Sequence, residues 1–379
     1  MAQPKTARRP EAVTWDQVAA FRLARHDLST RGERDLVRVC TDVCGVQSQI
    51  DSAGRLALWA RMKTLAAGQV EHALWRTRTL VKASLMRQTL HLVPAADYPL
   101  YIAALKTSRT AAALRVMARL GANERDAAHL NELVLKALDG CALAQPEIRS
   151  QLRPLVGKNV QEWMDRVSSV LRTALAAGLV CYGGQRGREI TYDRVDQWLT
   201  KLKPVEERAA QLELFRRYLR AYGPATARDF GRWSGLPVSA VRPLTEVLRP
   251  QLAQVELEGA KVFVLARDLG ELSRAKLKQD IVRLLPHFDP YLLAHADKAH
   301  LVAPRFYKRV YRSQGWISPV VLVNGRVAGV WNYTRVGQRL RVQVEPFEKL
   351  VRSVRQRVEE EADRLGTFLG HPAQVSFAS

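Results

Sequence analysis

Residues 205–268 read VEERAAQLELFRRYLRAYGPATARDFGRWSGLPVSAVRPLTEVLRPQLAQVELEGAKVFVLARD. Apolar residues recur there at helical spacing, and Gly223-Pro224 supplies a helix stop. Two alternating runs follow, and Glu258-Gly259-Ala260 between them suits the positive φ of a tight hairpin turn. The pattern predicts helices at 205–222, 226–233 and 237–248, then hairpin strands at 252–257 and 261–265. Three helices followed by a two-stranded wing is the order of a winged helix.

A second copy of this order lies upstream. It comprises expected helices at 123–139, 145–152 and 161–177 and strands at 179–182 and 189–192. The connection between the strands, residues 183–188, reads GGQRGR and carries Arg186 and Arg188. A glycine-rich turn with two arginines is suited to contact a DNA groove, and we predict that it does. The alternative is an ordinary exposed hairpin that happens to be basic.

The two ends of the chain differ from these copies. Before residue 120, helices are expected at 14–28, 34–43, 56–65 and 69–76, with a strand ladder at 80–86 and 89–93, which also fits a winged helix. After residue 270 the pattern changes to strands, and the hairpin signal Asn324-Gly325 lies between runs 316–323 and 326–332. Residues 339–344 alternate polar and apolar, and 347–369 form a charged amphipathic helix.

The expected fold class is therefore α+β, with tandem winged-helix domains followed by a small C-terminal β-barrel or curved sheet. The predicted boundaries are a disordered basic leader at 1–12, winged helices at 13–120, 121–203 and 204–270, and the C-terminal β-domain at 271–379.

The charge of the chain is strongly basic. Its 59 Lys and Arg residues exceed its 37 Asp and Glu residues, so the formal net charge is +22. Such a field attracts a polyanion without specifying a sequence, and an arginine bias that only aids solubility is the plain alternative. Membranes are anionic too, but the chain lacks a basic amphipathic helix with a bulky apolar face, so no membrane partner is expected. We expect a cytoplasmic, nucleoid-associated protein.

Four cysteines are too few and too scattered for a disulfide framework. Cys40 and Cys44 lie one helical turn apart, but no second Cys or His pair nearby completes a tetrahedral zinc site. Reduced, buried thiols are expected, and no metal or cofactor.

The segment Gly45-Val46-Gln47-Ser48-Gln49 is unusual because it places two glutamines at i and i+2 after a helix. On an extended loop these side chains point the same way, so both amides can aim at one small object. Carboxamides donate and accept hydrogen bonds but transfer no protons at neutral pH. They can hold a water against an electron-poor carbon or read a base edge; a solvated loop is the plainer alternative.

No nucleophile triad, phosphate-binding loop or dinucleotide fingerprint occurs in the chain. His91 lies in the alternating run Thr89-Leu90-His91-Leu92, which allows it to face outward, although a lone histidine of this kind is more often structural than catalytic.

Several separated motifs occur together in one order: residues 45–49, helix 56–62, Arg87-Gln88-Thr89-Leu90-His91-Leu92-Val93, Tyr222-Gly223-Pro224-Ala225-Thr226 with Asp229 and Trp233, Leu285-Pro286-His287-Phe288-Asp289, Gly315-Trp316 and residues 323–331. The set resembles the AlkZ/YcaQ family of winged-helix DNA glycosylases, over nearly the whole chain after residue 14. The family's catalytic Q-x-Q falls on Gln47 and Gln49, which is similar to the azinomycin-resistance branch. Ser48 departs from the usual apolar middle residue.

The resemblance implies a monomer with a C-terminal β-domain that cups double-stranded DNA, and excision of bulky N7- or N3-alkylated purines, including unhooking of interstrand crosslinks. An N7-alkylated base leaves without a general acid, so two amides that position a water suffice. No lysine lies in the loop, which favours a monofunctional enzyme over a Schiff-base lyase. Predicted DNA contacts are His91, Arg55, Arg87, Arg186, Arg188 and Arg326. The alternative function is a non-catalytic winged-helix transcriptional regulator.

Overall fold

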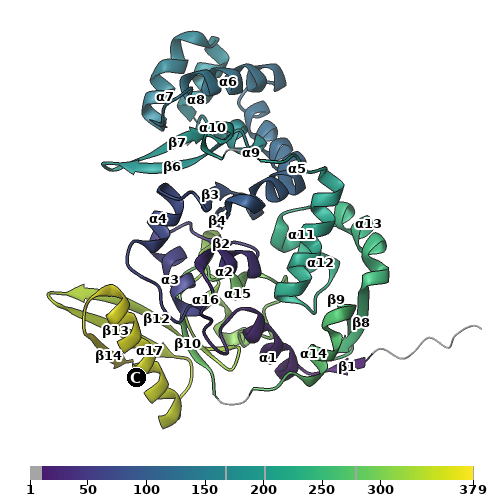
Figure 1. The fold of residues 1–379 in the computed structure, drawn as a ribbon, viewed down its shortest axis with the longest axis vertical. Coiled ribbons are helices and arrows are strands. Elements are labelled where there is room, and N and C mark those ends of the chain that lie inside the picture. Colours follow the sequence, from purple (N-terminus) through teal and green to yellow (C-terminus); the bar gives the residue numbers. More distant parts are fainter. Residues whose placement is uncertain (1–10, 167–168, 200–201, 278–279, 379) are drawn as a thin grey trace, which may run out of the picture. The chain divides into compact units, whose positions relative to one another are not determined.

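The computed structural model describes residues 11–166, 169–199, 202–277 and 280–378. The chain forms two compact units. Figure 1 labels the helices and strands named below. Unit 1 comprises Met1–Gly32, Phe215–Arg232 and Pro237–Ser379, and unit 2 comprises Glu33–Leu214 and Trp233–Leu236. Both units combine helices with sheets whose strands pair mainly antiparallel, so the fold is α+β, as the sequence predicts.

Unit 2 begins with three helices around a small sheet. The helices are α2 (Leu36–Asp42), α3 (Asp51–Arg61) and α4 (Gln69–Trp75), and the antiparallel sheet has the order β2 (Val46–Gln47), β4 (Leu90–Pro94), β3 (Leu80–Ser84). One apolar cluster joins the helices to this sheet, with Cys40, Leu58, Leu80 and Leu92 among its members. Burial of this cluster, which includes Val46 of β2, holds β2 as an edge strand beside β4.

The second half of unit 2 is mainly helical. It contains α5 (Tyr98–Ala118), α6 (Glu124–Ala137), α7 (Gln145–Leu152), α8 (Lys158–Arg166), α9 (Arg172–Ala177) and α10 (Val195–Trp198), with a sheet of order β5 (Leu143–Ala144), β7 (Glu189–Arg194), β6 (Val180–Arg186). Trp163 is fully buried in the apolar cluster of these helices. α5 packs against α9, which brings residues far apart in sequence together.

Most of the helix-and-hairpin run expected at 205–268 lies in unit 1, while its residues 205–214 and 233–236 belong to unit 2. The structure has α11 (Glu207–Tyr222), α12 (Ala227–Ser234) and α13 (Val238–Leu248), then β8 (Leu252–Leu257) and β9 (Ala260–Leu265). β1 (Glu11–Val13) pairs parallel to β8 and makes this a three-stranded sheet. α1 (Trp15–Arg25) and α14 (Leu269–Arg274) pack beside it, and Phe21 and Leu272 are buried there.

The rest of unit 1 is a five-stranded sheet covered by a long helix. The strands are β10 (Val282–Leu285), β11 (Val320–Val323), β12 (Arg326–Val336), β13 (Arg339–Pro346) and β14 (Ala373–Phe377), in that order. α17 (Arg352–Leu369) packs against β10 and β14 (Figure 1), and the short helices α15 (Pro290–Leu293) and α16 (Tyr307–Val310) lie in the long β10–β11 connection. Among the described residues β10 and β14 are the two edges, so the sheet is open. The barrel form of the expected C-terminal domain is therefore wrong.

Other differences from the sequence prediction concern element ends. Residues 11 and 12, expected in the disordered leader, belong to β1, while residues 1–10 lie outside the described part. The helix expected at 161–177 is two helices, α8 and α9. β6 extends through Arg186, so its turn is only Gly187-Arg188 rather than residues 183–188. The division into three winged helices and a C-terminal domain stays a prediction.

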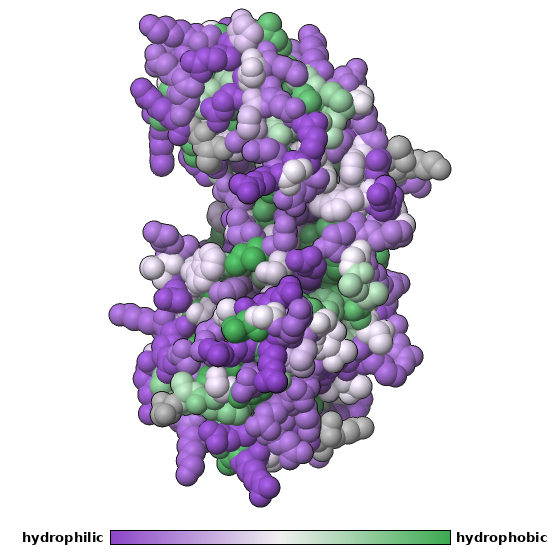
Figure 2. Space-filling view, turned by 90° about the vertical axis from the view of Figure 1, so that its left-hand side faces the viewer, coloured by the Kyte–Doolittle hydropathy of each residue, from purple (hydrophilic) through white to green (hydrophobic). Residues whose placement is uncertain are grey.

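The face drawn in Figure 2 is mostly hydrophilic, and its apolar patches are small and scattered. None of the helices that the structure describes is long and apolar enough to span a bilayer.

Candidate active site

The Q-x-Q loop starts at a backbone turn that needs glycine. Cys44 and Gly45 have φ angles of 54° and 91°. A Cβ at position 45 would lie 2.9 Å from Cγ1 of Val93 on β4. The absence of a side chain therefore lets β2 leave α2 and pair closely with β4, where Gln47 lies opposite His91.

Ser48 anchors the middle of the loop. Its amide donates to the carbonyl of Leu90 at 2.8 Å, and its side chain is buried against α3. A Cβ at Gly54 of α3 would lie 2.6 Å from Ser48 Oγ, so helix and loop touch without an intervening side chain. A small hydroxyl in place of the expected apolar residue thus fits a helix that carries glycine at the contact.

Gln47 is held by an arginine from the β3–β4 connection. Arg87 Nη2 donates to Gln47 Oε1 at 3.0 Å, and Arg87 Nη1 donates to the carbonyl of Trp233. Gln47 is only 4% exposed. Arg87 was predicted to contact DNA; in this structure its guanidinium fixes the amide of Gln47.

Gln49 is exposed and is held differently. Its Oε1 accepts a hydrogen bond from the backbone N–H of Leu90 at 3.2 Å. Leu90 therefore holds the loop through two hydrogen bonds: its carbonyl accepts from the Ser48 amide, and its own amide donates to Gln49 Oε1.

These two contacts fix which way both amides face. Guanidinium and backbone N–H groups only donate, so the acceptor on each glutamine must be its carbonyl oxygen. No acceptor within the described residues is bonded to either NH2 group. The NH2 of each glutamine, and one lone pair of each Oε1, are thus left for a ligand.

His91 is buried at 2% exposure, so the outward orientation that the sequence allows is wrong. Its strand is covered on both faces, and its Nδ1 lies 2.9 Å from the carbonyl of Thr89. Burial, and then the charge of Arg87, lower the pKa of His91 to about 3. The imidazole opposite Gln47 is therefore neutral at physiological pH and adds no cation to the site.

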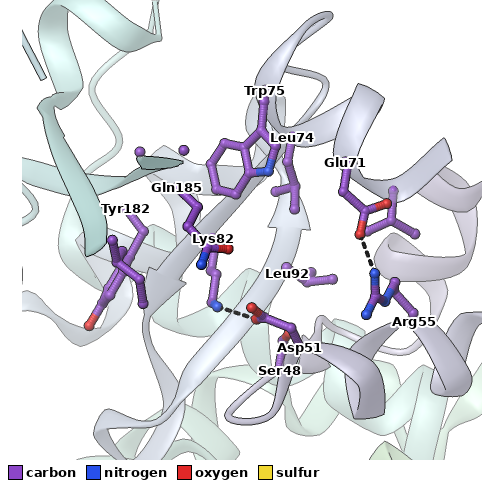
Figure 3. A pocket seen from close by; sticks show the side chains of 14 residues that line it. Ser48, Asp51, Arg55, Glu71, Leu74, Trp75, Lys82, Leu92, Tyr182 and Gln185 are labelled. Atoms are coloured by element: carbon purple, nitrogen blue, oxygen red, sulfur yellow. Dashed lines mark hydrogen bonds and ion pairs between the residues drawn. The ribbon is translucent and has the colours of Figure 1, made fainter. Parts of the chain in front are cut away.

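Two cavities border the loop. Gln49 lines one of about 260 Å³ together with Gln88, Arg109, Arg172 and other side chains. Ser48 lines another of about 300 Å³, where Figure 3 shows two ion pairs and the ring of Trp75. Lys82 Nζ donates to Asp51 Oδ1 at 2.5 Å, and Arg55 Nη1 pairs with Glu71 at 2.7 Å. Arg55, a predicted DNA contact, is thus half-exposed and already paired.

The remaining predicted DNA contacts lie elsewhere. Arg186 at the end of β6 and Arg188 in the β6–β7 turn are both exposed, and Arg186 pairs with Glu147 on α7. Arg326 begins β12 in unit 1, is largely exposed and lies 3.9 Å from Asp16.

The sequence did not point to Arg109 or Arg172. They lie on α5 and α9, and only the packing of those helices brings them to the cavity of Gln49. No local motif marks either position.

The cysteines are free thiols. Cys40, Cys44 and Cys181 are buried as expected, and burial raises the pKa of Cys40 to about 12. Cys141 is exposed, contrary to expectation.

A family model described as DNA glycosylase AlkZ-like matches residues 40–368. The chain belongs to this AlkZ-like family. An interstrand DNA cross-link repair glycosylase of Streptomyces sahachiroi is 32% identical over 370 residues, which cover 94% of this chain and 97% of that protein. The solved structure of Streptomyces sahachiroi DNA glycosylase AlkZ is similar with a TM-score of 0.85 and 31% identity, over 96% of this chain and all of that one.

As an AlkZ-like family member the chain is a DNA glycosylase, an enzyme that hydrolyses N-glycosidic bonds in DNA. The alternative of a non-catalytic regulator is not supported.

Proposed function

We propose that the protein is a monofunctional glycosylase that excises bulky N7- or N3-alkylated purines from double-stranded DNA, with Gln47 and Gln49 positioning the attacking water. The observation that carries the proposal is the anchoring of both glutamine carbonyls, by Arg87 and by Leu90, which leaves both NH2 groups for a ligand.

Excision of an alkylated purine requires few catalytic groups from the protein. An N7-alkylated purine is cationic, so it leaves as a neutral base and needs no general acid. Water attacks the anomeric carbon as its bond to the purine nitrogen breaks and the oxocarbenium ion develops, and the proton that the water loses passes to solvent. A fixed amide can donate to the water oxygen or accept from its hydrogen, and orientation of this kind lowers the barrier.

Burial favours a water over a base as the partner of Gln47. A side chain that is 4% exposed reaches only a small ligand pressed against the loop. His91 across the strand pair is a weak base because its pKa is lowered to about 3, and the amides themselves transfer no protons. Gln49, which is exposed, is the amide open to the nucleotide itself.

Lys82 supports the monofunctional assignment. It is the lysine that lines the Ser48 cavity, but its side chain is only 8% exposed and donates to Asp51. A lyase needs a free amine that attacks the sugar. We therefore expect borohydride to trap no covalent complex.

Three further assignments accompany the proposal. The relative from Streptomyces sahachiroi is named for interstrand cross-link repair, and we propose that this chain also unhooks such crosslinks as a monomer. The β6–β7 and β8–β9 hairpins act as wings of winged-helix domains. The +22 charge supplies attraction to the duplex.

The test uses a duplex with one N7-alkylguanine and excess protein. Release of free modified base and an intact abasic strand is the expected result. Gln47→Ala and Gln49→Ala should each slow release by about tenfold or more, since each removes a positioned hydrogen-bonding group. Gln374→Ala, an exposed glutamine on β14, is the matched control. Unchanged release by both loop variants would show that the site is wrong.

Gln47→Glu refines the test. A carboxylate still accepts from Arg87 but carries no NH2 group. If the NH2 group orients the water, Gln47→Glu should be as slow as Gln47→Ala while melting like the wild type. A fully active Gln47→Glu would assign the role to the carbonyl oxygen instead.

A crosslinked duplex tests unhooking separately. Separation of the strands on a denaturing gel, lost in Gln47→Ala, is expected. Release of a monoadduct without unhooking would limit the enzyme to single-strand lesions.

A further inference from the structure

The geometry points to a DNA phosphate as the ligand of the cavity beside Gln49, on the strand that carries the altered base. This inference rests on the proposed function and places the backbone of its substrate.

The walls of this cavity are basic and polar. None of its lining residues within the described part of the chain is a carboxylate. Its polar members are Gln49, Ser84, Gln88, Arg109, Gln145, Ser169, Arg172, Tyr182 and Tyr192. The neighbouring Ser48 cavity is different, because there each cation already has a carboxylate partner. Two guanidinium groups without acidic neighbours attract an anion.

Arg109 carries hydrogen-bond donors that the protein leaves unused. It is 6% exposed, and its Nη2 donates to the carbonyl of Leu175 at 2.6 Å. Its Nε and Nη1 are buried and have no acceptor among the described residues. Buried donors of a charged group are costly to leave unpaired, so such a pair marks a place for an acceptor.

Arg172 on α9, the helix that packs against α5, also carries an unused hydrogen-bond donor. It is half-buried on α9, and its Nε is also buried without an acceptor in the described structure. Both arginines line the same cavity although they come from α5 and α9. A fork of guanidinium donors from two directions suits the several oxygens of one phosphate.

The charge excludes the altered base itself as this ligand. Burial lowers the pKa of Arg109 to about 10, which still leaves it cationic at neutral pH. A cationic N7-alkylpurine would be repelled by two such groups, whereas a phosphodiester is attracted. With its phosphate held here, the adjoining sugar comes next to the amide of Gln49, which shares the cavity.

The experiment combines a protein change with a single DNA change. The full chain is titrated against duplexes that carry a 2′-fluoro N7-methylguanosine, whose glycosidic bond resists cleavage, and one uncharged methylphosphonate at each position around it. Affinity is measured for the wild type and Arg172→Gln. We expect one phosphate position at which the methylphosphonate weakens wild-type binding by about tenfold and Arg172→Gln binding hardly at all.

Arg115→Gln is the control, because Arg115 is exposed on α5 outside the cavity and its replacement removes the same charge as Arg172→Gln. It should leave the wild-type pattern of sensitive phosphates in place. Arg172→Gln should also reduce the log–log salt slope of binding by about 0.9, the contribution of one phosphate. Arg109→Lys, checked by melting, should reproduce the loss at the same position.

The inference would be overturned if the losses of binding free energy caused by Arg172→Gln and by the methylphosphonate were additive at every phosphate position. These measurements read affinity only, so failure of base release with intact coupling would refute the catalytic proposal and leave the phosphate site standing. Base release without this coupling between Arg172 and one phosphate would refute the phosphate site and leave the catalytic proposal standing.

Discussion

Arg87 and Gln88 both adopt left-handed backbone angles, with φ of 54° and 60°. For residues other than glycine such angles cost on the order of 1–3 kcal/mol each and persist where surrounding contacts demand them. Here the strained turn carries the Arg87 guanidinium to Gln47 and to the Trp233 carbonyl. The sequence singled out Arg87 as basic and near the motif, but its partners lie 40 and 146 residues away, so its role could not be predicted.

Replacement of Arg87 separates positioning from DNA binding. In Arg87→Met the Gln47 amide is free to rotate, so the single-turnover rate of base release should fall by about tenfold. Affinity for undamaged duplex should stay close to the wild type, because the arginine contacts protein. Arg38→Met, an exposed arginine on α2, controls for the lost charge. If affinity falls while the rate at saturation is kept, Arg87 is a DNA contact after all.

At the scale of elements, the hairpins and their flanking helices were the predictable part. Local signals suffice for them: turn glycines, caps such as Thr14, and alternating strands. α5 was missed because its apolar residues are distributed around the helix rather than along one stripe. β1 and β14 were missed because each pairs in parallel with a strand that is distant or separated by a helix.

The contact between the Q-x-Q loop and α3 gives a stability prediction. Gly54→Ala places a methyl group 2.6 Å from Ser48 Oγ, so it should destabilise the fold by roughly 1–3 kcal/mol. Adding Ser48→Gly removes the obstructing atoms and should restore most of the loss. Chemical denaturation of the two single variants and the double variant measures this coupling. Additive losses would mean that Ser48 does not determine the cost.

The β6–β7 turn gives a binding prediction. Arg188 is exposed at the turn, whereas Arg186 pairs with Glu147. Arg188→Gln should therefore weaken binding to any duplex sequence by about threefold to tenfold, and Arg186→Gln by less. Fluorescence anisotropy with two unrelated duplexes measures both. Equal affinities for the wild type and the double variant would reduce the hairpin to a plain surface turn.

At the scale of the whole molecule, the buried His91 and His295 and the partly buried His300 make stability depend on pH. Burial, and then nearby arginine charges, lower the pKa of His91 to about 3, that of His300 to about 2, and that of His295 well below its usual value. The unfolded chain binds protons at these sites below about pH 6.5, while the folded chain does not. The contribution of these histidines to the free energy of unfolding should therefore be fully present above pH 6.5 and should decrease as pH falls.

Urea denaturation at pH 7.5, 6.5 and 5.5 checks this expectation, because carboxylates titrate below that window. Each such histidine contributes up to about 1.4 kcal/mol per pH unit. His295 and His300 both contact Arg22, so their protonation also places like charges together in unit 1. A denaturation midpoint that is constant from pH 7.5 to 5.5 would contradict the assignment of neutral histidines.

The pairing of β1 with β8 has a consequence for how the protein is made. Glu11 lies beside Val255, and Arg31 near the start of the chain binds Glu361 near its end. On the ribosome, β1 and α1 are made well before their partners β8 and α14, which follow more than 200 residues later, and Arg31 meets Glu361 later still. Unit 2, whose residues are nearly contiguous, can bury its core in the meantime. The Q-x-Q loop can thus fold while β1 and α1 are still without their partners, and chaperones that shield nascent chains would meet that segment.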